Sequence, residues 1–496
     1  MLKNKISILL ILFPVLTFSQ QATINFNIIN TSYNEISITN NDYANPEVMF
    51  GNQDFDLKLI NGKVSCIFNF SKPVFITAYY RINEKATYSS YTFYLRPFDN
   101  LNFTTDLKNP LQSHSITGIG SENNQPQIQH LYDFPMKLDA CKKDSLPYLV
   151  YNTIIEQSVK NKILFDNYIK THNPSKEFIK TQNLLLQYFP LIEYIMFKGS
   201  QKFNIYISYI RNEKKWQAIE DSLLSVININ NDELLNVPNY LYFISTYITR
   251  QKERIWEHPD LKNLYLSNTE TATIFDNDPE NLLMERIINK HFSKKTAEFL
   301  IADLFKQSLN NNEDNLQEIF ERFLKSYPQS KYITYIEPEM IKVNERSKRI
   351  LSNKMIFVEN TDSLLTFDDV LKLFKGKTVL LDMWGTWCGP CRSEILINSD
   401  SIKNHFKNKN LNYLYIANYD ENKVAKWKEL IAYYNLTGTH ILASKKLTDN
   451  IMKKLKRDEF PTYIIIKKDG TYDLSKAGYP MDRKILYKQL ESALME

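Results

Sequence analysis

The uneven distribution of glycine constrains the fold of this chain more than any other feature of its sequence. The 496 residues contain 11 glycines, about 2% of the chain, whereas globular proteins average about 7%. Only Gly199 falls between residues 121 and 350, but six glycines follow residue 375. Because glycine permits the positive-φ turns of tight hairpins, a long stretch almost without it favours helices. The sequence therefore divides into regions of different character.

Residues 20–120 are predicted to be rich in β-strands. Apolar and polar residues alternate along Ala22–Ile28, which is typical of a strand with one buried face. Asn61-Gly62 separates two further strand-like runs, Phe55–Ile60 and Val64–Phe70, and this dipeptide favours a hairpin turn. Half-buried antiparallel strands bury their apolar faces by packing in two layers, so we expect a β-sandwich-like N-terminal domain.

Residues 121–350 are predicted to form an α-helical domain. Apolar residues recur at helical spacing over Leu316–Tyr327, and Asn315 with Glu318 resembles a capping box at the start of that helix. Leu184–Phe197 is apolar on several faces, which is typical of a helix buried in a core. We therefore expect a bundle of roughly eight helices in this region.

Residues 351–496 alternate between strand-like and helix-like runs. The predicted strands are Thr378–Met383, Leu411–Ala417, Thr462–Lys467 and Thr471–Lys476, and the predicted helices are Cys388–His405, Glu421–Tyr434 and Met481–Ala493. Asp469-Gly470 joins the last two strands as an antiparallel hairpin. The order β-α-β-α-β-β-α predicts an α/β domain in which helices cover both faces of a mixed sheet.

The N-terminus has the pattern of a secretory signal peptide over residues 1–19. Lys3 and Lys5 precede an almost wholly apolar run, Ile6–Phe18, and small residues stand at the positions required for cleavage before Gln20. The run is too short to cross a bilayer, which takes about 20 apolar residues. No cysteine lies near the cleavage point, so we expect no lipid anchor. The chain is therefore predicted to be exported to the periplasm without stable insertion in the membrane.

The charge balance gives little support to nucleic-acid binding. The chain carries 61 Lys and Arg against 56 Asp and Glu, a formal net charge of +5, and its basic residues form no concentrated stripe. The basic run Lys453–Arg457 is typical of a solvated helix face. We therefore expect no nucleic-acid partner.

Four cysteines occur, which is too few for a disulfide-stabilised scaffold. Cys66 and Cys141 lie far apart in the sequence, and two interpretations stay open for them. They are either buried small apolar residues or the two halves of a bridge formed in an oxidising compartment. The other two, Cys388 and Cys391, are separated by only a Gly-Pro dipeptide.

The Cys-Gly-Pro-Cys motif at 388–391 stands where a predicted strand ends and a helix begins. The free N–H groups and positive dipole end of a helix N-terminus stabilise a thiolate, which lowers the pKa of Cys388. Cys391 lies one helical turn further on, within reach for a disulfide. Gly389 leaves the approach to Cys388 open, and Pro390 suits a first turn, where no N–H is required. The alternatives are a static disulfide or half of a zinc site, but no second CxxC or HxxxH pair occurs.

These residues resemble the thioredoxin superfamily, and within it the exported TlpA/ResA-like thiol-disulfide oxidoreductases. Asp382 lies six residues before Cys388, at the position where that superfamily places a buried acid. Phe460-Pro461-Thr462 resembles its cis-proline loop, and Cys391-Arg392-Ser393-Glu394 resembles the run common in the TlpA-like group. The resemblance covers residues 351–496 and implies a C-terminal α/β thioredoxin fold.

The resemblance also implies the catalytic roles. Cys388 would attack a substrate disulfide, and Cys391 would resolve the resulting mixed disulfide. Asp382 would relay the proton of Cys391. Two interpretations stay open for Glu394, a solvated helix residue or a functional carboxylate.

A further group of residues is expected to bind the substrate. Pro461 and the backbone of Phe460 would line the groove that holds the substrate strand. Trp387 would shield Cys388, with Gly389 and Pro390 beside it. Trp384 is expected to pack in the interior, and His440 is expected to be structural.

We predict an exported thiol-disulfide oxidoreductase that reduces protein disulfides and uses no cofactor beyond its own Cys388–Cys391 disulfide. Its partners would be protein thiol or disulfide clients and a membrane electron donor that restores the dithiol. One alternative is an oxidase or isomerase of the same fold. Another is a partner-binding protein, in which residues 20–350 capture the partner and the thioredoxin-like domain is a redox-gated arm.

Overall fold

The computed structural model describes residues 21–51, 53–82, 87–129, 146–204, 206–258, 260–261, 265, 280–309 and 313–496. The predicted signal peptide at 1–19 and Cys141 lie outside these residues. The chain divides into two units, residues 1–250 and 251–496, so the helical region is shared between them. No helix within the described ranges is both long enough and apolar enough to cross a membrane.

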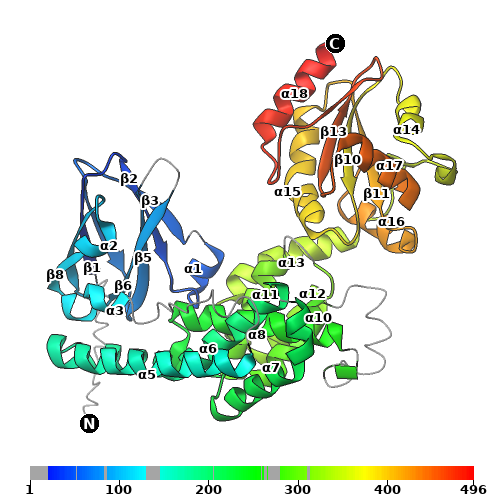
Figure 1. The fold of residues 1–496 in the computed structure, drawn as a ribbon. Helices are drawn as coiled ribbons and strands as arrows, with labels where there is room; N and C mark the ends of the chain where they lie inside the picture. Colours follow the sequence, from blue (N-terminus) through cyan, green and yellow to red (C-terminus); the bar gives the residue numbers. More distant parts are fainter. Residues whose placement is uncertain are drawn as a thin grey trace, which may run out of the picture. The chain divides into compact units, whose positions relative to one another are not determined.

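The first unit begins with two four-stranded sheets, whose orders are β4-β1-β7-β8 and β3-β2-β5-β6 (Figure 1). The strands are β1 (Gln21–Ile29), β2 (Glu35–Asn40), β3 (Asp54–Lys58), β4 (Lys63–Asn69), β5 (Val74–Arg81), β6 (Tyr88–Leu95), β7 (Asn100–Asp106) and β8 (Ser115–Ile119). Alternate residues of both sheets, such as Ile24 and Phe26 of β1 and Ile76 of β5, share one hydrophobic core. The β-sandwich-like fold predicted for this region is confirmed.

The hairpin-type turn predicted at Asn61-Gly62 is confirmed, but the two strands that flank it belong to different sheets. Asn61 and Gly62 have φ angles of 52° and 75°, and Ile60 and Lys63 form an isolated bridge. Beyond this bridge the strands separate, since β3 pairs with β2 in one sheet and β4 pairs with β1 in the other. Strand β1 also pairs in parallel with β7, where only antiparallel pairing was expected. The dipeptide determines the turn, but each strand's partner depends on which layer buries its apolar face.

The helices follow the sandwich in the sequence and continue from the first unit into the second. The predicted α-helical middle region is confirmed. The long helices are α5 (Pro147–His172), α6 (Lys176–Asn204), α7 (Tyr206–Val226), α8 (Pro238–Glu257), α10 (Glu280–His291), α11 (Lys294–Ser308), α12 (Leu316–Ser326) and α13 (Ile333–Ser347). The short helices near the sandwich are α1 (Pro46–Phe50), α2 (Pro110–Ser113), α3 (Pro126–Gln129), η1 (Ser121–Asn123) and η2 (Asp232–Leu234). The run Leu184–Phe197 lies within α6 and buries Leu191 and Tyr194 completely.

The capping box expected at the start of α12 is wrong. Asn315 adopts a left-handed conformation with φ 60° and ψ 2°, and its side chain makes no capping hydrogen bond. A side-chain cap requires an extended backbone at this position, which the spacing of Asn315 and Glu318 alone cannot ensure. The helix itself buries Ile319 and Phe323 as the apolar spacing predicts.

The second unit contains a six-stranded mixed sheet of order β14-β13-β10-β11-β12-β9 (Figure 1). Its elements are β9 (Met355–Phe357), η4 (Thr361–Ser363), α14 (Phe367–Leu373), β10 (Thr378–Trp384), α15 (Gly389–His405), β11 (Leu411–Asn418), α16 (Val424–Tyr433), β12 (Gly438–Ala443), α17 (Lys445–Leu455), β13 (Thr462–Ile466), β14 (Tyr472–Leu474) and α18 (Arg483–Met495). Every residue of β10 is buried. On one face of β10, Val379, Leu381 and Met383 pack in a core with residues of α14 and α17. On the other face, Leu380 and Trp384 pack in cores with residues of α15, α16 and α18.

The expected element order lacks two strand-helix units, β9 with α14 and β12 with α17. Strand β12 is short and contains the polar pair Thr439-His440, so it lacks the continuous apolar run that identifies β10 and β11. The basic run Lys453–Arg457, which was interpreted as a solvated helix face, begins in the last turn of α17 and extends past its end at Leu455. The buried face of that helix lies further upstream, at Leu447 and Ile451.

Helices α12 and α13 are attached to the sheet domain of the second unit by buried ion pairs. Asp314 contacts Arg392 of α15 at 3.5 Å and Lys426 of α16 at 2.7 Å, and all three side chains are at most 14% exposed. At the end of α13, Arg346 pairs with Glu313 at 2.5 Å. The carboxylate of Asp314 therefore compensates two cations that α15 and α16 bury.

We predict that Asp314→Asn destabilises the second unit. The substitution removes the carboxylate that Arg392 and Lys426 share, although Lys426 keeps Glu429 at 3.0 Å, and costs about 3 kcal/mol. Denaturant unfolding of the full chain measures the effect. The matched control is Glu318→Gln, because Glu318 is 68% exposed and lies 3.8 Å from Arg322, and its effect should stay within about 0.5 kcal/mol. Equal effects of the two substitutions would contradict the role of Asp314.

Candidate functional site

The two cysteines lie at the junction between the central strand and the helix that follows it. Strand β10 ends at Trp384, and Cys388 is the N-cap of α15, where its sulfur accepts a hydrogen bond from the Cys391 backbone N–H at 3.2 Å. The two sulfurs form a disulfide, and the residues are 3% and 1% exposed. The positive end of the α15 dipole and its free N–H groups therefore face the sulfur of Cys388 and favour its thiolate.

Two polar residues at the carboxyl end of β11, Asn418 and Asp420, hold the turn that carries Cys388. Asp420 accepts hydrogen bonds from the backbone N–H and the hydroxyl of Thr386, at 2.7 and 2.6 Å. The side-chain amide of Asn418 donates to the Trp384 carbonyl at 2.9 Å, and the backbone carbonyl of Asn418 accepts from the Trp387 indole N–H at 2.9 Å. Strands β10 and β11 are parallel, so their carboxyl ends lie side by side and Asn418 and Asp420 reach this turn. Sequence reasoning missed both residues, although polar residues directly after a parallel strand were a signal.

An aromatic surface borders the disulfide. Trp387 is 48% exposed, and its ring packs edge-on against Phe460 at 5.7 Å and lies 6.2 Å from Tyr419. Phe460 packs against the cluster that holds both cysteines, and its peptide bond to Pro461 is cis. The structure therefore brings the predicted substrate-binding residues Trp387, Phe460 and Pro461 to the same edge of the domain as Cys388.

The other predicted residues, both within the motif and elsewhere in the domain, differ in exposure. Pro390 is exposed and Gly389 is half-buried, with no atom within 4 Å of the position where a Cβ would stand. Trp384 is completely buried in the core beside the cysteines. His440 is also completely buried, where burial lowers its pKa to about 4 and its ring stacks on Tyr415 at 5.2 Å.

Asp382 is a buried carboxyl in the middle of β10. Its neighbours in the sheet are Tyr415 of β11 and Tyr463 of β13. Burial raises the pKa of Asp382 to about 8, and the negative charge of Glu394 adds to this shift. The described residues offer its Oδ1 atom no hydrogen-bond partner. The acid therefore stays protonated in the folded protein up to about pH 8, close to the pH at which thiols exchange protons.

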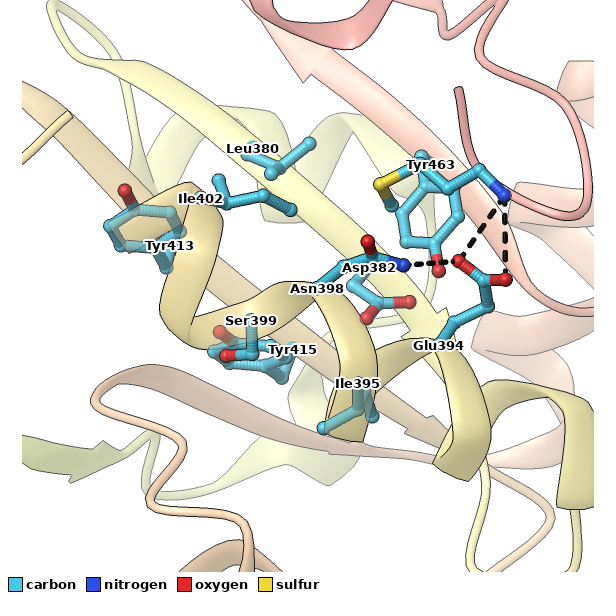
Figure 2. A pocket seen from close by; sticks show the side chains of 11 residues that line it. Leu380, Asp382, Glu394, Ile395, Asn398, Ser399, Ile402, Tyr413, Tyr415 and Tyr463 are labelled. Atoms are coloured by element: carbon cyan, nitrogen blue, oxygen red, sulfur yellow. Dashed lines mark hydrogen bonds between the residues drawn. The ribbon is translucent and has the colours of Figure 1, made fainter. Parts of the chain in front are cut away.

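A small cavity connects Asp382 with α15. Its volume is about 30 Å³, which is room for about two water molecules. Figure 2 shows that Asp382, Glu394 and Ile395 line it, with Tyr463 beside Asp382. Because Glu394 and Ile395 belong to the helical turn after Cys391, Asp382 faces the turn of α15 that directly follows Cys391.

Glu394 is buried rather than solvated, which rules out its interpretation as an exposed helix residue. It is 5% exposed and accepts hydrogen bonds from the Asn398 amide at 2.6 Å and the Met481 backbone N–H at 3.3 Å (Figure 2). Two carboxyl groups, those of Asp382 and Glu394, thus share one poorly solvated space. No group of three or more His, Cys, Asp or Glu residues is arranged to hold a metal ion in the part of the chain that is described.

A family model described as thioredoxin-like matches residues 376–472. This segment contains β10, α15 and the disulfide, so this part of the chain is a thioredoxin-like domain with a Cys-x-x-Cys pair. The resemblance and the C-terminal α/β thioredoxin fold that were predicted from the sequence are confirmed.

Solved structures and a curated protein also show similarity. One is the thioredoxin domain of a thiol-disulfide oxidoreductase from Bacteroides vulgatus, with 23% identity over 25% of this chain and 84% of that chain and a TM-score of 0.22. Another is a secreted disulfide oxidoreductase of Mycobacterium tuberculosis, with 19% identity over 24% of this chain and 85% of that chain and a TM-score of 0.21. ATPase expression protein 1, mitochondrial, of Vanderwaltozyma polyspora is 23% identical over 270 residues, which are 52% of this chain and 61% of that protein. The chain thus spans less than two thirds of the length of that relative.

We predict that Asp382→Asn stabilises the oxidised protein at alkaline pH. The carboxyl group ionises near its ordinary pKa of 3.8 in the unfolded chain and near 8 in the folded protein. The folded state therefore loses stability as the pH rises from about 4 through 8, and the amide removes this loss. We expect a gain of roughly 3 kcal/mol at pH 9 and a much smaller change at pH 4, measured by denaturant unfolding.

The matched control is Asp473→Asn, because Asp473 lies exposed on the edge strand β14. This control should follow the pH dependence of the parent protein. An Asp382→Asn variant whose stability parallels the parent at both pH values would show that Asp382 ionises normally.

Proposed function

We propose that the chain is an exported thiol-disulfide oxidoreductase that reduces protein disulfides through Cys388 and Cys391. The observation that carries the proposal is the placement of this pair within a thioredoxin-like domain, with Cys388 as the N-cap of α15. That placement favours the thiolate form of the first sulfur and puts the second within bonding distance of it.

The first step consumes the thiolate of Cys388. It attacks one sulfur of the substrate disulfide, so that a bond forms between Cys388 and this sulfur while the substrate's own S–S bond breaks. The other substrate sulfur leaves as a thiolate and takes a proton from solvent. The helix N-terminus supports this step, because it keeps Cys388 ionised at neutral pH.

The second step releases the reduced substrate. Cys391 loses its proton to the ionised fraction of Asp382 and attacks the Cys388 sulfur. The disulfide between the two cysteines re-forms while the bond between Cys388 and the substrate breaks, and the substrate sulfur leaves as a thiolate that takes the proton back from Asp382. The substrate gains two electrons and two protons in the full cycle, and the dithiol loses them. A pKa of about 8 suits Asp382 for this exchange, since a group that titrates near the working pH both accepts and donates protons.

The aromatic surface beside the disulfide is the proposed substrate groove. Trp387 and Tyr419 offer exposed ring area, and the backbone at Phe460 and Pro461 stands beside the cluster of Cys388. Gly389 has open space where a side chain would otherwise stand, so an approaching disulfide meets no obstacle there. An extended client segment with apolar side chains fits such a surface.

The reducing direction is proposed from the dipeptide between the cysteines. Gly-Pro matches thioredoxin, whose potential lies near about −270 mV, rather than the oxidant DsbA near about −120 mV. A reductase outside the cytoplasm must be recharged, which implies a membrane dithiol donor as a partner. The N-terminal signal pattern at residues 1–19 supports export to the periplasm.

We predict that the Cys391→Ser variant accumulates mixed disulfides with client proteins in the exported fraction. Without the resolving sulfur, the first step stops at the bond between Cys388 and the client. Non-reducing electrophoresis and mass spectrometry measure the captured species. Cys388→Ser is the control, and it should capture nothing and lose turnover in an insulin-reduction assay. Turnover that survives in Cys388→Ser would overturn the mechanism, and capture confined to the cytoplasm would overturn export.

We also predict a reduction potential near about −270 mV, measured by equilibration with a dithiol buffer. Trp387 lies next to Cys388 in the chain, so indole fluorescence provides the signal. A value above about −200 mV would favour the oxidase or isomerase alternative instead.

A further inference from the structure

A second site lies in the first unit, far along the chain from the cysteines. A cavity of about 450 Å³ opens between the sandwich and the helices α6 and α8 of the same unit. Protein interiors contain few voids larger than a water molecule, whereas ligand pockets measure about 300–1,000 Å³. The cavity is therefore too large for a packing defect and has the size of a ligand pocket.

The floor of this cavity is the outer face of β5 and β6. Thr77 lies opposite Thr92, and Tyr79 lies opposite Ser90, in the cross-strand register. The residues between them, such as Ala78, point into the sandwich core. The sheet thus presents a ladder of hydroxyl groups to the cavity, with Tyr79 38% exposed at its open end.

Amide side chains from other elements complete the walls. Asn41 donates to the Thr77 hydroxyl at 2.8 Å, and Gln182 enters from α6. Asn239 enters from the first turn of α8. Within the described residues, the side chains of Ser90 and Asn239 make no hydrogen bond, so both remain available to a ligand.

Among the residues that the structure describes, none that lines this cavity carries a charge, although 24% of the chain is charged. Phosphate, carboxylate and ammonium ligands would therefore find no counter-ion here. A lipid chain would leave the side chains of Ser90 and Asn239 without partners. The chemistry of the walls thus favours a neutral ligand that both donates and accepts hydrogen bonds.

A peptide strand added to β6 is also excluded at this position. β6 is the edge strand of its sheet, but Gln129 already bonds the backbone N–H and carbonyl of Thr92, at 3.0 and 2.7 Å. Asn124 does the same at Tyr94, at 2.7 and 2.9 Å. These two side chains occupy the backbone groups that strand addition would use.

We propose that this cavity binds a neutral saccharide. Sugar hydroxyls match the donor and acceptor capacity of Ser90, Asn239 and the threonine ladder, and the apolar face of a sugar ring fits the exposed ring of Tyr79. The site is independent of the proposed thiol chemistry, because every residue that lines it belongs to the first unit.

The test is binding of the full chain to an array of neutral, sialylated and sulfated oligosaccharides. We expect binding to neutral members, confirmed by calorimetry with the strongest of them. Tyr79→Ala and Asn239→Ala should each weaken binding about fivefold or more, since each removes one ring contact or one hydrogen-bonding group. Both residues are exposed, so these variants are expected to fold.

The matched control is Tyr88→Ala, because Tyr88 is an exposed aromatic residue of the neighbouring strand β6 and does not line the cavity. It should bind the oligosaccharide as the parent does. Failure to bind any neutral oligosaccharide, a preference for acidic ones, or equal loss in Tyr88→Ala would overturn the proposal. Insulin reduction should stay unchanged in all three variants, which separates this outcome from failure of the thiol chemistry.

Discussion

The site depends on β10, a strand whose residues are all buried between two layers of helices. Apolar residues on both faces anchor this strand at the centre of its domain, so its carboxyl end has little freedom to move. That end places Cys388 at the N-terminus of α15 and sets Asn418 and Asp420 of the neighbouring strand against the same turn. The position of the reactive sulfur is therefore a consequence of the sheet's core rather than of the short loop that carries it.

Strand β10 also carries Asp382, whose burial disfavours the ionised carboxylate. The N-terminus of α15 favours the thiolate of Cys388, whereas burial of Asp382 beside Glu394 favours the neutral acid. These two opposite effects act on either side of Cys391. In the proposed mechanism, the ionised fraction of Asp382 would accept the proton that leaves Cys391, and its raised pKa gives it a high affinity for that proton.

The sequence predicted what depends on local chemistry and missed what depends on distant partners. The Cys-Gly-Pro-Cys motif, the continuous strand before it and the helix after it were all foreseen, because each has a signal within a few residues. Asn61-Gly62 was correctly identified as a turn, but no local signal shows that its flanking strands join different sheets. Asp420 was missed because its partner, Thr386, lies 34 residues away. Strand β12 was missed because its polar residues are buried only by the fold around them.

The glycines of the motif region illustrate the same distinction. A Cβ on Gly385 would stand 2.5 Å from the Trp387 indole nitrogen, so the turn requires glycine for the close approach of that ring. A Cβ on Gly389 would meet nothing within 4 Å, so the fold would accept a side chain there. Packing therefore explains Gly385, but it does not explain Gly389. The open space at Gly389 has a physical use only if something approaches Cys388 from outside, which is what attack on a protein disulfide requires.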